Sequence, residues 1–343
     1  MKAVAFQHSL EIDDPDALVD ITLVDPIATD HDLLVEVRAI SVNPVDVKKR
    51  VSGKNMGDSW KVLGWDAAGI VRAAGIVRAA GEDVKMFAPG DKVWYAGSIT
   101  RPGSNSEFQL VDECIVGRMP NNLDFAAAAA LPLTSLTAWE MLFDRFSIEQ
   151  GAQSKGKSLL VIGAAGGVGS IMTQLARRLT GLTVIGTASR TETQAWVAEA
   201  GAHHVIDHSR PLGPQLSEIG IPHPDYVVSL THTDRHFDQI VEFIAPQGKF
   251  GLIDDPEFFD VRKLKLKSVS LHWELMFTRS MFHTEDMVQQ HYILTQIAKL
   301  VEEGVLRTTV AENFGVINAT NLKRAHALIE SGKSRGKVVL EGF

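Results

Sequence analysis

The chain has 343 residues and a mass of 37.4 kDa, a size at which a single hydrophobic core usually stops growing, so two domains are expected. Its 34 basic and 42 acidic residues give a net charge of −8, which argues against broad binding to nucleic acid or to anionic membranes. The single cysteine, Cys114, excludes an intramolecular disulfide framework and a cysteine-rich structural zinc site.

The beginning of the chain does not read as a secretory signal. Residues 1–6 are followed at once by His8 and by the acidic stretch from Glu11 to Asp16, so a long apolar segment does not form. Apolar runs such as 125–132 are far shorter than the roughly 20 residues that cross a membrane. We therefore expect a cytoplasmic protein with no membrane partner.

The first 120 or so residues predict a β-rich module. Residues 33–40 mix alternation with a continuous apolar run, residues 91–95 follow a Pro-Gly turn, and residues 107–111 alternate. Within this module the six residues Gly69–Ala74 are repeated at once as 75–80. Two copies are too few for a repeat architecture, and an even-length insertion leaves the facing of a strand unchanged, so a longer hairpin or a bulged loop is expected.

From about Phe125 the pattern changes to an alternation of helices and strands. After an Ala-rich helical stretch that continues to Glu140, strands and helices follow one another, which indicates a doubly wound parallel sheet with helices on both faces. The predicted strands are 158–162, 183–186, 204–206, 226–230 and 249–253, and the predicted helices are 169–179 and 191–200. Two further helices, 287–303 and 321–330, and a closing strand, 337–340, are expected in the C-terminal segment.

A glycine-rich turn joins the first of these strands to the first of these helices. The turn reads Ala164-Ala165-Gly166-Gly167-Val168-Gly169, with alanine in place of the first glycine of the usual dinucleotide fingerprint. Glycine lets the backbone approach a pyrophosphate, and the helix N-terminus offers free N–H groups and a positive dipole end. Because the flanking strand and helix are both present, the turn predicts a dinucleotide site.

The end of the second strand distinguishes the two nicotinamide cofactors. An NAD site usually has an acidic residue there, whereas this chain has Ser189 and Arg190. A carboxylate would repel a 2′-phosphate, and arginine can pair with one through two hydrogen bonds. NADPH is therefore expected, although Arg190 could also be a solvated loop charge.

Several segments together resemble the medium-chain dehydrogenase/reductase superfamily, in particular its zinc-free quinone oxidoreductase branch. The resemblance covers essentially the whole chain, and residues 270–280 resemble a subgroup often labelled zinc-type alcohol dehydrogenase-like. Its other marks are residues 41–46, 64–69, 89–93, 131–140 and the glycine-rich turn. The resemblance implies an α/β fold: a Rossmann domain at 126–269 that binds NADPH, and a GroES-like β-rich catalytic domain at 1–125 and 270–343.

The resemblance also bears on zinc. Members that use catalytic zinc carry Cys, His and Cys at positions that align with Asn43, Trp65 and Leu133 here, and tryptophan and leucine cannot bind a metal. The four-cysteine structural lobe is missing too, since residues 93–107 are short and cysteine-free. No metal is therefore expected. Without a Lewis acid the oxidation of an alcohol is difficult, whereas a quinone or an activated alkene is electrophilic enough to accept hydride.

The resemblance implies roles for individual residues. Asn43 would lie over the nicotinamide and hold a substrate oxygen, although an asparagine before a proline also suits a turn. Trp65 and Tyr95 are candidates for lining a pocket for a flat substrate, and both could equally be core residues. The implied cofactor contacts are Thr137 at the ring or its ribose, Ala165, Gly166, Gly167, Val168 and Gly169 at the pyrophosphate, Thr231 and His232 towards the ribose and nicotinamide, and Leu252, Ile253 and Asp254 at the carboxamide edge.

The expected activity is direct hydride transfer from NADPH to a quinone or an enone. A 2-enoyl or acryloyl-type reductase is the nearest alternative, and a crystallin-like or sensor protein that only binds NADPH is the alternative from another class. The family commonly forms dimers through the last strand of the cofactor sheet, here 269–273, so a homodimer is expected.

Overall fold

The structure is a computed structural model that describes residues 1–52, 59–74 and 84–343. It divides into two compact units, one containing Met1–Leu136 and Phe277–Phe343 and the other Thr137–Met276. Both divisions fall later along the chain than the expected domain boundaries at 125/126 and 269/270. The strand after residue 269 therefore belongs to the second unit, because it is hydrogen-bonded to that unit's sheet.

The unit Thr137–Met276 is built on a six-stranded parallel sheet in the order β11-β10-β9-β12-β13-β14. Its strands are β9 (Ser158–Ile162), β10 (Thr183–Thr187), β11 (His204–Ile206), β12 (Tyr226–Ser229), β13 (Lys249–Leu252) and β14 (Ser270–Trp273). The order of the strands reverses between β9 and β12, and in such sheets ligands bind beside the carboxyl ends of the strands at this reversal. The predicted Rossmann sheet is confirmed.

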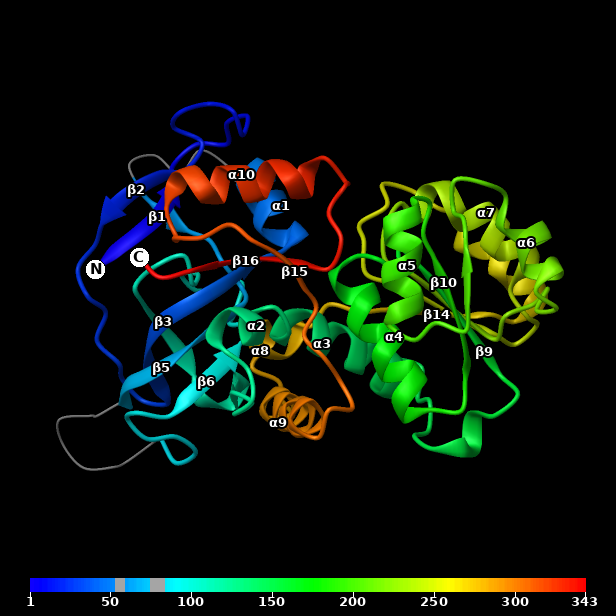
Figure 1. The fold of residues 1–343 in the computed structure, drawn as a ribbon, viewed down its shortest axis with the longest axis horizontal. Coiled ribbons are helices and arrows are strands. Elements are labelled where there is room, and N and C mark those ends of the chain that lie inside the picture. The colour runs from blue at the N-terminus through cyan, green and yellow to red at the C-terminus, as the bar shows by residue number, and fades with distance from the viewer. Residues whose placement is uncertain (53–58, 75–83) are drawn as a thin grey trace. The chain divides into compact units, whose positions relative to one another are not determined.

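Helices cover both faces of this sheet. Figure 1 shows α4 (Gly167–Leu179) and α5 (Thr191–Glu199) on one side, and α6 (Leu212–Glu218) and α7 (Thr233–Phe243) on the other. The shorter turns η3 (Ala152–Ser154) and η4 (Val261–Lys267) complete the unit.

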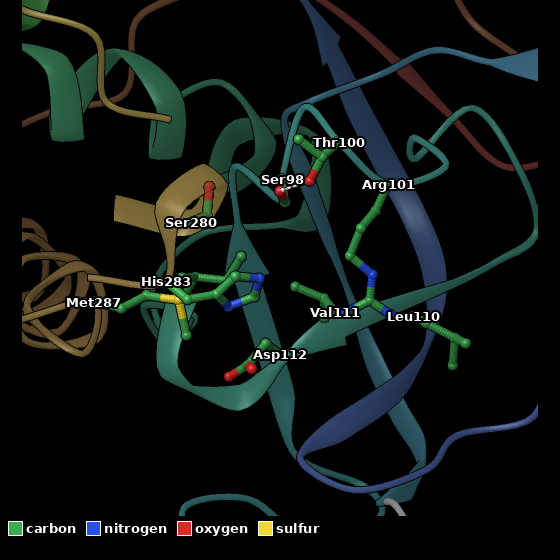
Figure 2. A pocket seen from close by; sticks show the side chains of 10 residues that line it. Ser98, Thr100, Arg101, Leu110, Val111, Asp112, Ser280, His283 and Met287 are labelled. Carbon is green, nitrogen blue, oxygen red and sulfur yellow. Dashed lines mark hydrogen bonds between the residues drawn. The ribbon is translucent and has the colours of Figure 1, made fainter. Parts of the chain in front are cut away.

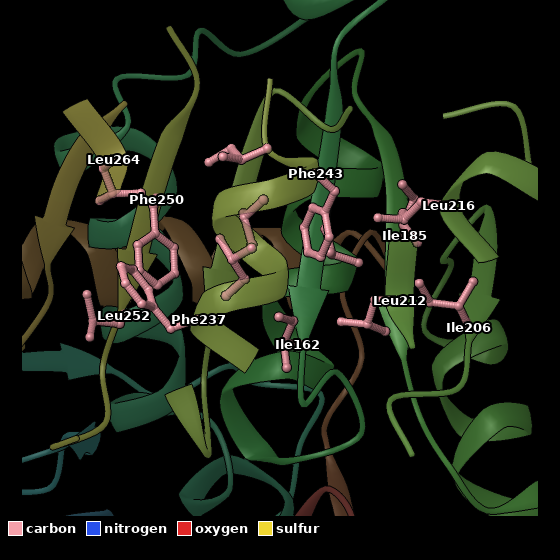
Figure 3. Packing of buried hydrophobic residues seen from close by; sticks show 14 residues of the cluster. Ile162, Ile185, Ile206, Leu212, Leu216, Phe237, Phe243, Phe250, Leu252 and Leu264 are labelled. Carbon is pink, nitrogen blue, oxygen red and sulfur yellow. The ribbon is translucent and has the colours of Figure 1, made fainter. Parts of the chain in front are cut away.

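One face of the sheet packs on α6 and α7 through a single apolar cluster (Figure 3). Strand residues such as Ile162 and Ile185 contact helix residues such as Leu216 and Phe243, and all four are buried. Burial of large aliphatic and aromatic side chains contributes about 1.5–3 kcal/mol each. This cluster fixes the helices and, with them, the loops at the carboxyl ends of the strands.

The other unit carries two sheets. The larger has seven strands in the order β15-β16-β3-β5-β6-β8, with β7 also paired to β3, and the smaller has the order β2-β1-β4. Their bounds are β1 (Lys2–Phe6), β2 (Val19–Thr22), β3 (Asp32–Val42), β4 (Lys61–Val62), β5 (Ala67–Ala74), β6 (Lys92–Tyr95), β7 (Phe108–Asp112), β8 (Val116–Arg118), β15 (Val310–Asn313) and β16 (Lys337–Glu341). β16 pairs with β3, so a strand from late in the chain completes a sheet that begins near the N-terminus. The predicted β-rich module is confirmed.

The helices of this unit range from short turns to the 14 residues of α9. They are α1 (Pro44–Ser52), the turn η1 (Glu113–Ile115), α2 (Phe125–Ala129), α8 (Thr278–Phe282), α9 (Gln289–Glu302) and α10 (Ala319–Glu330), together with most of α3 (Pro132–Trp139). α1 and α10 contact each other, and α9 contacts β8. α1 begins directly after Asn43, so its first turn fixes the backbone beside the predicted catalytic residue.

The first copy of the tandem repeat, Gly69–Ala74, lies in β5 and pairs with β3. The pairing of β3 with β5 shifts register twice, and the backbone of Gly69 lies so close to the carbonyl of Glu36 that a β-carbon would clash with it. The second copy, residues 75–80, lies outside the described residues, so the expected hairpin or bulged loop stays a prediction.

The stretch Phe125–Arg145, formed by α2, α3 and the π-helical turn η2 (Glu140–Arg145), is long and apolar enough to cross a membrane by length and composition. Of its most apolar window, 78% is buried inside the protein, which is typical of a core helix. The apolar run 125–132 is much shorter than this stretch, because the stretch consists of several helical segments that continue one another across a proline.

Candidate functional site

The glycine-rich turn connects β9 to α4 at the reversal of strand order. Gly163, just before the turn, has φ +84°, a conformation that favours glycine. A β-carbon on Gly163 would lie 3.0 Å from the methyl carbon of Thr231, which follows β12. The loops after β9 and β12 therefore meet at this point, and the absence of a side chain at residue 163 permits the contact.

The turn ends at the N-terminus of α4, whose N-cap is Gly166. Glycine supplies no capping oxygen, so the first N–H groups of a 13-residue helix remain available to an anion. A β-carbon on Gly169 would lie 2.5 Å from the carbonyl oxygen of Gly163 and from Cα of Ala164, so only glycine allows the helix to pack this closely. These features fit a dinucleotide pyrophosphate.

Ala164 occupies the place of the first fingerprint glycine, and β10 explains why alanine fits there. Ala164 is buried, and a β-carbon on the neighbouring Gly186 would lie 2.9 Å from the β-carbon of Ala164. Because Gly186 has no side chain, there is room beside it for the methyl group of Ala164. The imperfect fingerprint is compensated by a glycine on the next strand.

The expected site for the 2′-phosphate lies at the end of β10. Ser189 is exposed, and Arg190, the N-cap residue of α5, is half-buried. The guanidinium Nε of Arg190 lies 3.0 Å from a carboxylate oxygen of Glu192, an acidic neighbour that the prediction from the sequence did not include. The pair is partly exposed, so an incoming phosphate can compete with Glu192 for the guanidinium.

The remaining predicted cofactor residues lie after β12 and β13. His232 has a left-handed backbone conformation with φ 50° and precedes α7. The carboxylate of Asp254 accepts the backbone N–H of Thr233 at 2.9 Å and also accepts from its hydroxyl. Asp254 therefore caps α7 and ties the end of β13 to it, a role that the prediction of a carboxamide contact did not include.

Three other predicted residues differ in burial. The side chain of Leu252 is fully buried in the apolar cluster, whereas Ile253 is half-buried. Thr137 in α3 is 5% exposed. Side-chain contact between Leu252 and a cofactor is incompatible with its place in the core, so only its backbone is available for such a contact.

In the other unit, the structure brings together four buried polar residues that we call the Lys337 cluster: Asn43, Asp46, Asp66 and Lys337. The ammonium group of Lys337 donates to Asp66 Oδ2 at 3.0 Å, to the carbonyl of Val42 at 3.2 Å and to Asn43 Oδ1. Asn43 Nδ2 donates to the same Asp66 oxygen at 3.0 Å. The other oxygen of Asp66 accepts the backbone N–H of Leu133 at 2.9 Å.

Burial governs the ionisation of the two carboxyl groups in this cluster. Burial raises the pKa of Asp66, and Lys337 together with the N–H donors offsets part of that rise. Burial raises the pKa of Asp46 to about 7, although its Oδ2 accepts the backbone N–H of Asn43 at 2.6 Å. At neutral pH the carboxyl group of Asp46 is therefore about half protonated, whereas a solvent-exposed aspartate is ionised.

The cluster occupies much of the hydrogen-bonding capacity of Asn43, the predicted catalytic residue. Its carbonyl oxygen accepts from Lys337 and one of its amide hydrogens is donated to Asp66. The other donor interaction, to the carbonyl of Ser41, is long at 3.4 Å. One amide hydrogen can therefore still be offered to a substrate oxygen, and the predicted role of Asn43 stays a prediction.

Asn43 was predicted from the sequence, but its three partners were missed. Asp66 follows Trp65 directly, and Asp46 lies three residues beyond Asn43, so both lay inside segments already noted for their resemblance to the family. Lys337 gave no such signal, because it meets Asn43 only through the pairing of β16 with β3.

Trp65 and Tyr95, the predicted pocket residues, are each about 1% exposed. The indole N–H of Trp65 donates to the carbonyl of Ser98 at 3.1 Å, and its ring meets Phe277 edge-on. Burial raises the pKa of the Tyr95 hydroxyl well above its usual range. This burial is typical of core side chains, and the prediction that the two line a pocket stays a prediction.

A small cavity of about 70 Å³ lies in this unit, and Figure 2 shows the side chains around it. Ser98 and Thr100, whose hydroxyls lie 2.9 Å apart, meet His283 and Met287 there. The guanidinium of Arg101 is paired through two hydrogen bonds with Asp32. The volume suits one or two water molecules rather than a quinone.

The side chains at the three zinc-ligand positions do not fit zinc. Asn43 is engaged by a lysine and an aspartate, Trp65 donates its ring N–H to a carbonyl, and Leu133 takes part only through its backbone. A buried ammonium group already lies beside the one carboxylate that Asn43 and Leu133 share. A second cation would meet strong repulsion there.

Comparisons with known proteins place both units in one family. Residues 29–120 match the alcohol dehydrogenase GroES-like domain, and residues 200–340 match the zinc-binding dehydrogenase family model. The chain is 41% identical to a zinc-type alcohol dehydrogenase-like protein of Staphylococcus aureus strain MSSA476 over 342 residues, which cover 99% of each chain.

Two solved structures extend the comparison. A protein from Rhizobium etli, whose structure is described as that of a zinc-dependent alcohol dehydrogenase, is 56% identical with a TM-score of 0.95, covering 100% of this chain and 98% of that one. Quinone oxidoreductase of Escherichia coli, solved with NADPH, is 22% identical with a TM-score of 0.83, covering 99% of this chain and 100% of that one. At that identity the second likeness shows the fold alone.

Proposed function

Because the chain belongs to the zinc-type alcohol dehydrogenase-like family of the medium-chain dehydrogenase/reductase superfamily, we propose that it is an NADPH-dependent reductase that acts on quinones or activated alkenes without zinc. Membership in this superfamily makes it an oxidoreductase. The finer assignment depends on the chemistry of its own residues.

The observation that carries this proposal is the Lys337 cluster. Asp66 accepts from Lys337, from Asn43 and from the backbone of Leu133, so two of the three aligned ligand positions are bonded to a carboxylate that already has a cation. Alcohol oxidation by relatives that use zinc depends on the metal to polarise the oxygen. A quinone or an enone needs no such activation, which supports reduction of these acceptors.

In the proposed mechanism, bound NADPH supplies a hydride to the acceptor. The N-terminus of α4 would hold the pyrophosphate, and the guanidinium of Arg190 would leave Glu192 to pair with the 2′-phosphate. Asn43 offers the amide hydrogen now directed at Ser41 to the acceptor oxygen, and Lys337 and Asp66 hold the amide in the orientation that makes this possible. The rate enhancement would then come mainly from positioning.

A substrate panel tests the proposal directly. Loss of NADPH absorbance is followed in stopped flow with menadione, with an α,β-unsaturated ketone and with a 2-enoyl thioester as alternative acceptors. Turnover of the quinone or the ketone supports the proposal, and preferential turnover of the thioester supports an enoyl reductase instead. NADPH binding without turnover of any acceptor would support a binding protein and overturn the proposal.

Two controls accompany this panel. Activity measured after dialysis against a chelator should be unchanged, and added zinc should not restore or raise it. The Arg190→Ser variant should lose about tenfold or more of its affinity for NADPH while its affinity for NADH stays within about twofold. Equal losses for both cofactors would argue against the assigned role of Arg190.

A further inference from the structure

Three histidines that the proposed function does not use as a group gather at the carboxyl edge of the cofactor sheet. His208 follows β11, His232 precedes α7, and His236 lies in the first turns of α7. The rings of His208 and His236 meet edge-on with centroids 6.3 Å apart. His232 is exposed, His208 is half-buried and His236 is 8% exposed.

The position of His208 relates it to the expected 2′-phosphate site. β10 and β11 are paired, with Thr187 opposite Ile206, and the backbone N–H of Ala188 donates to the carbonyl of Ile206 at 3.0 Å. Ser189 and Arg190 follow one of these strands and Asp207 and His208 follow the other. The two short segments therefore leave neighbouring strands at the same edge of the sheet.

The contact between His208 and Thr187 suits a ring that changes protonation state. Nδ1 of His208 lies 2.9 Å from Oγ1 of Thr187, which also accepts the backbone N–H of Gly163 at 3.0 Å. A hydroxyl can both donate and accept, so Thr187 can serve the neutral ring as a donor and the protonated ring as an acceptor. The same contact joins the glycine-rich turn to His208.

The charges around His208 oppose its protonation in the absence of an anion. Burial lowers the pKa of His208, His232 lowers it further, and Asp207 and the contact with Thr187 raise it. Burial likewise lowers the pKa of His236. The nearby His208, His232 and Arg235 lower this pKa further, and Asp234 raises it. Arg210 also lies near, beside Asp207. Burial and the neighbouring cations therefore both disfavour the protonated forms of His208 and His236.

We propose that His208 makes recognition of the 2′-phosphomonoester proton-linked: its ring takes up one proton from solvent when the phosphate binds, so preference for NADPH over NADH rises as pH falls. The proposal rests on the proposed use of NADPH. A dianion beside Arg190 adds negative charge to that of Asp207, and the charged form of His208 then becomes favourable.

Binding of 2′,5′-ADP tests this idea without any turnover, and 5′-AMP serves as the probe that lacks the 2′-phosphate. Kd is measured by calorimetry at about pH 6, 7 and 8 for the wild type, for His208→Gln and for His8→Gln, which changes an exposed histidine in the other unit. The ratio of Kd for His208→Gln to Kd for the wild type should rise from about 1 at pH 8 to roughly threefold or more at pH 6, where about tenfold is the limit that a one-unit rise in pKa can give. Comparing the variants at the same pH cancels the effect that ionisation of the phosphate itself has on Kd.

Proton uptake by the wild type provides a second readout that requires no variant. Repeating the titration at about pH 7 in two buffers of different ionisation enthalpy should show uptake of a fraction of a proton with 2′,5′-ADP and little with 5′-AMP. His8→Gln should follow the wild type. Uptake that is the same for both probes, or a Kd ratio that does not change with pH, overturns the proposal. If 2′,5′-ADP binds no better than 5′-AMP at any pH, the assignment of NADPH itself fails.

Discussion

Asp46 shows how one buried carboxyl group can tie stability to pH. Its Oδ2 accepts from the backbone of Asn43, and its Oδ1 has no hydrogen-bond partner among the described residues. Its folded-state pKa of about 7 exceeds the ordinary value of 3.8, chiefly because of burial. The folded state therefore holds a proton that the unfolded state releases between these two values.

Replacing Asp46 with Asn should remove this dependence. The wild type loses stability from this group as pH rises from about 4 to about 7, so the variant should gain relative to it over that range, by up to roughly 3 kcal/mol. Urea unfolding at several pH values measures the difference. The exposed Asp16→Asn serves as the control, and a gap between Asp46→Asn and the wild type that stays constant with pH would contradict the assignment.

His326 in α10 has the opposite effect. It is fully buried beside Arg50, and burial lowers its pKa to about 3. The stability that this residue contributes is present above about pH 6.5 and is lost as pH falls towards 3. His326→Leu should thus be less sensitive to acid, gaining roughly 3 kcal/mol relative to the wild type between neutral pH and about pH 4.5. Thermal unfolding across this range tests it, with His8→Gln expected to match the wild type.

The residues of the site differ in how far sequence alone identified them. The glycine-rich turn and Arg190 lie in continuous segments where a strand, a turn and a helix follow one another, so local pattern was sufficient to propose them as site residues. Lys337 lies 294 residues from Asn43 along the chain, and only sheet pairing joins them. The pairing of Glu192 with Arg190 depends on side-chain conformations, which a sequence pattern does not determine.

At the scale of elements, the parallel strands were predicted best. β9 and β11 were predicted with the bounds that the structure gives them. β9 is a short apolar run that is buried throughout, which is the pattern of an inner strand of a parallel sheet. The helix α1 was not predicted because Pro44 and the polar residues after it resemble a turn. The three-stranded sheet was missed as well, since β4 has only two residues.

The packing of α4 against β9 makes Gly169 a sharp test of the turn. Gly169→Ala puts a methyl group against the backbone of Gly163 and Ala164, which cannot move aside as a flexible side chain would. Affinity for NADPH should fall about tenfold or more, with a loss of stability of roughly 1–3 kcal/mol. Gly213→Ala in α6 of the same unit is the matched control, because its β-carbon would meet no atom within 4 Å and Gly213 is not among the predicted cofactor contacts. Similar behaviour of the two variants would argue against this packing.

At the scale of the whole molecule, we propose that two copies associate through β14, the edge strand of the six-stranded sheet. Trp273 on this strand is 52% exposed, and the nearby Leu275 is 51% exposed. An unpaired edge with exposed apolar side chains can pair with a second copy across a two-fold axis. This is consistent with the homodimer expected from the sequence.

Trp273→Lys should therefore weaken the dimer, raising its Kd about tenfold or more, since a buried lysine would face its own copy or apolar side chains. Light scattering after size exclusion over a range of concentrations measures this. Trp60→Lys changes a tryptophan that is 43% exposed in the other unit and should leave association unchanged. A wild type that is monomeric at every concentration would rule the interface out.

The pairing of β16 with β3 has a consequence for the order in which the protein is completed during synthesis. The unit Thr137–Met276 is continuous in the chain, whereas the other unit consists of two segments, one synthesised before it and one after it. A ribosome therefore releases the whole nucleotide-binding sheet before it has made Lys337, the residue that neutralises Asp66. Until then Asn43 and Asp66 flank strands of an incomplete sheet, so the nascent chain can form the proposed cofactor site before it can form the proposed catalytic site.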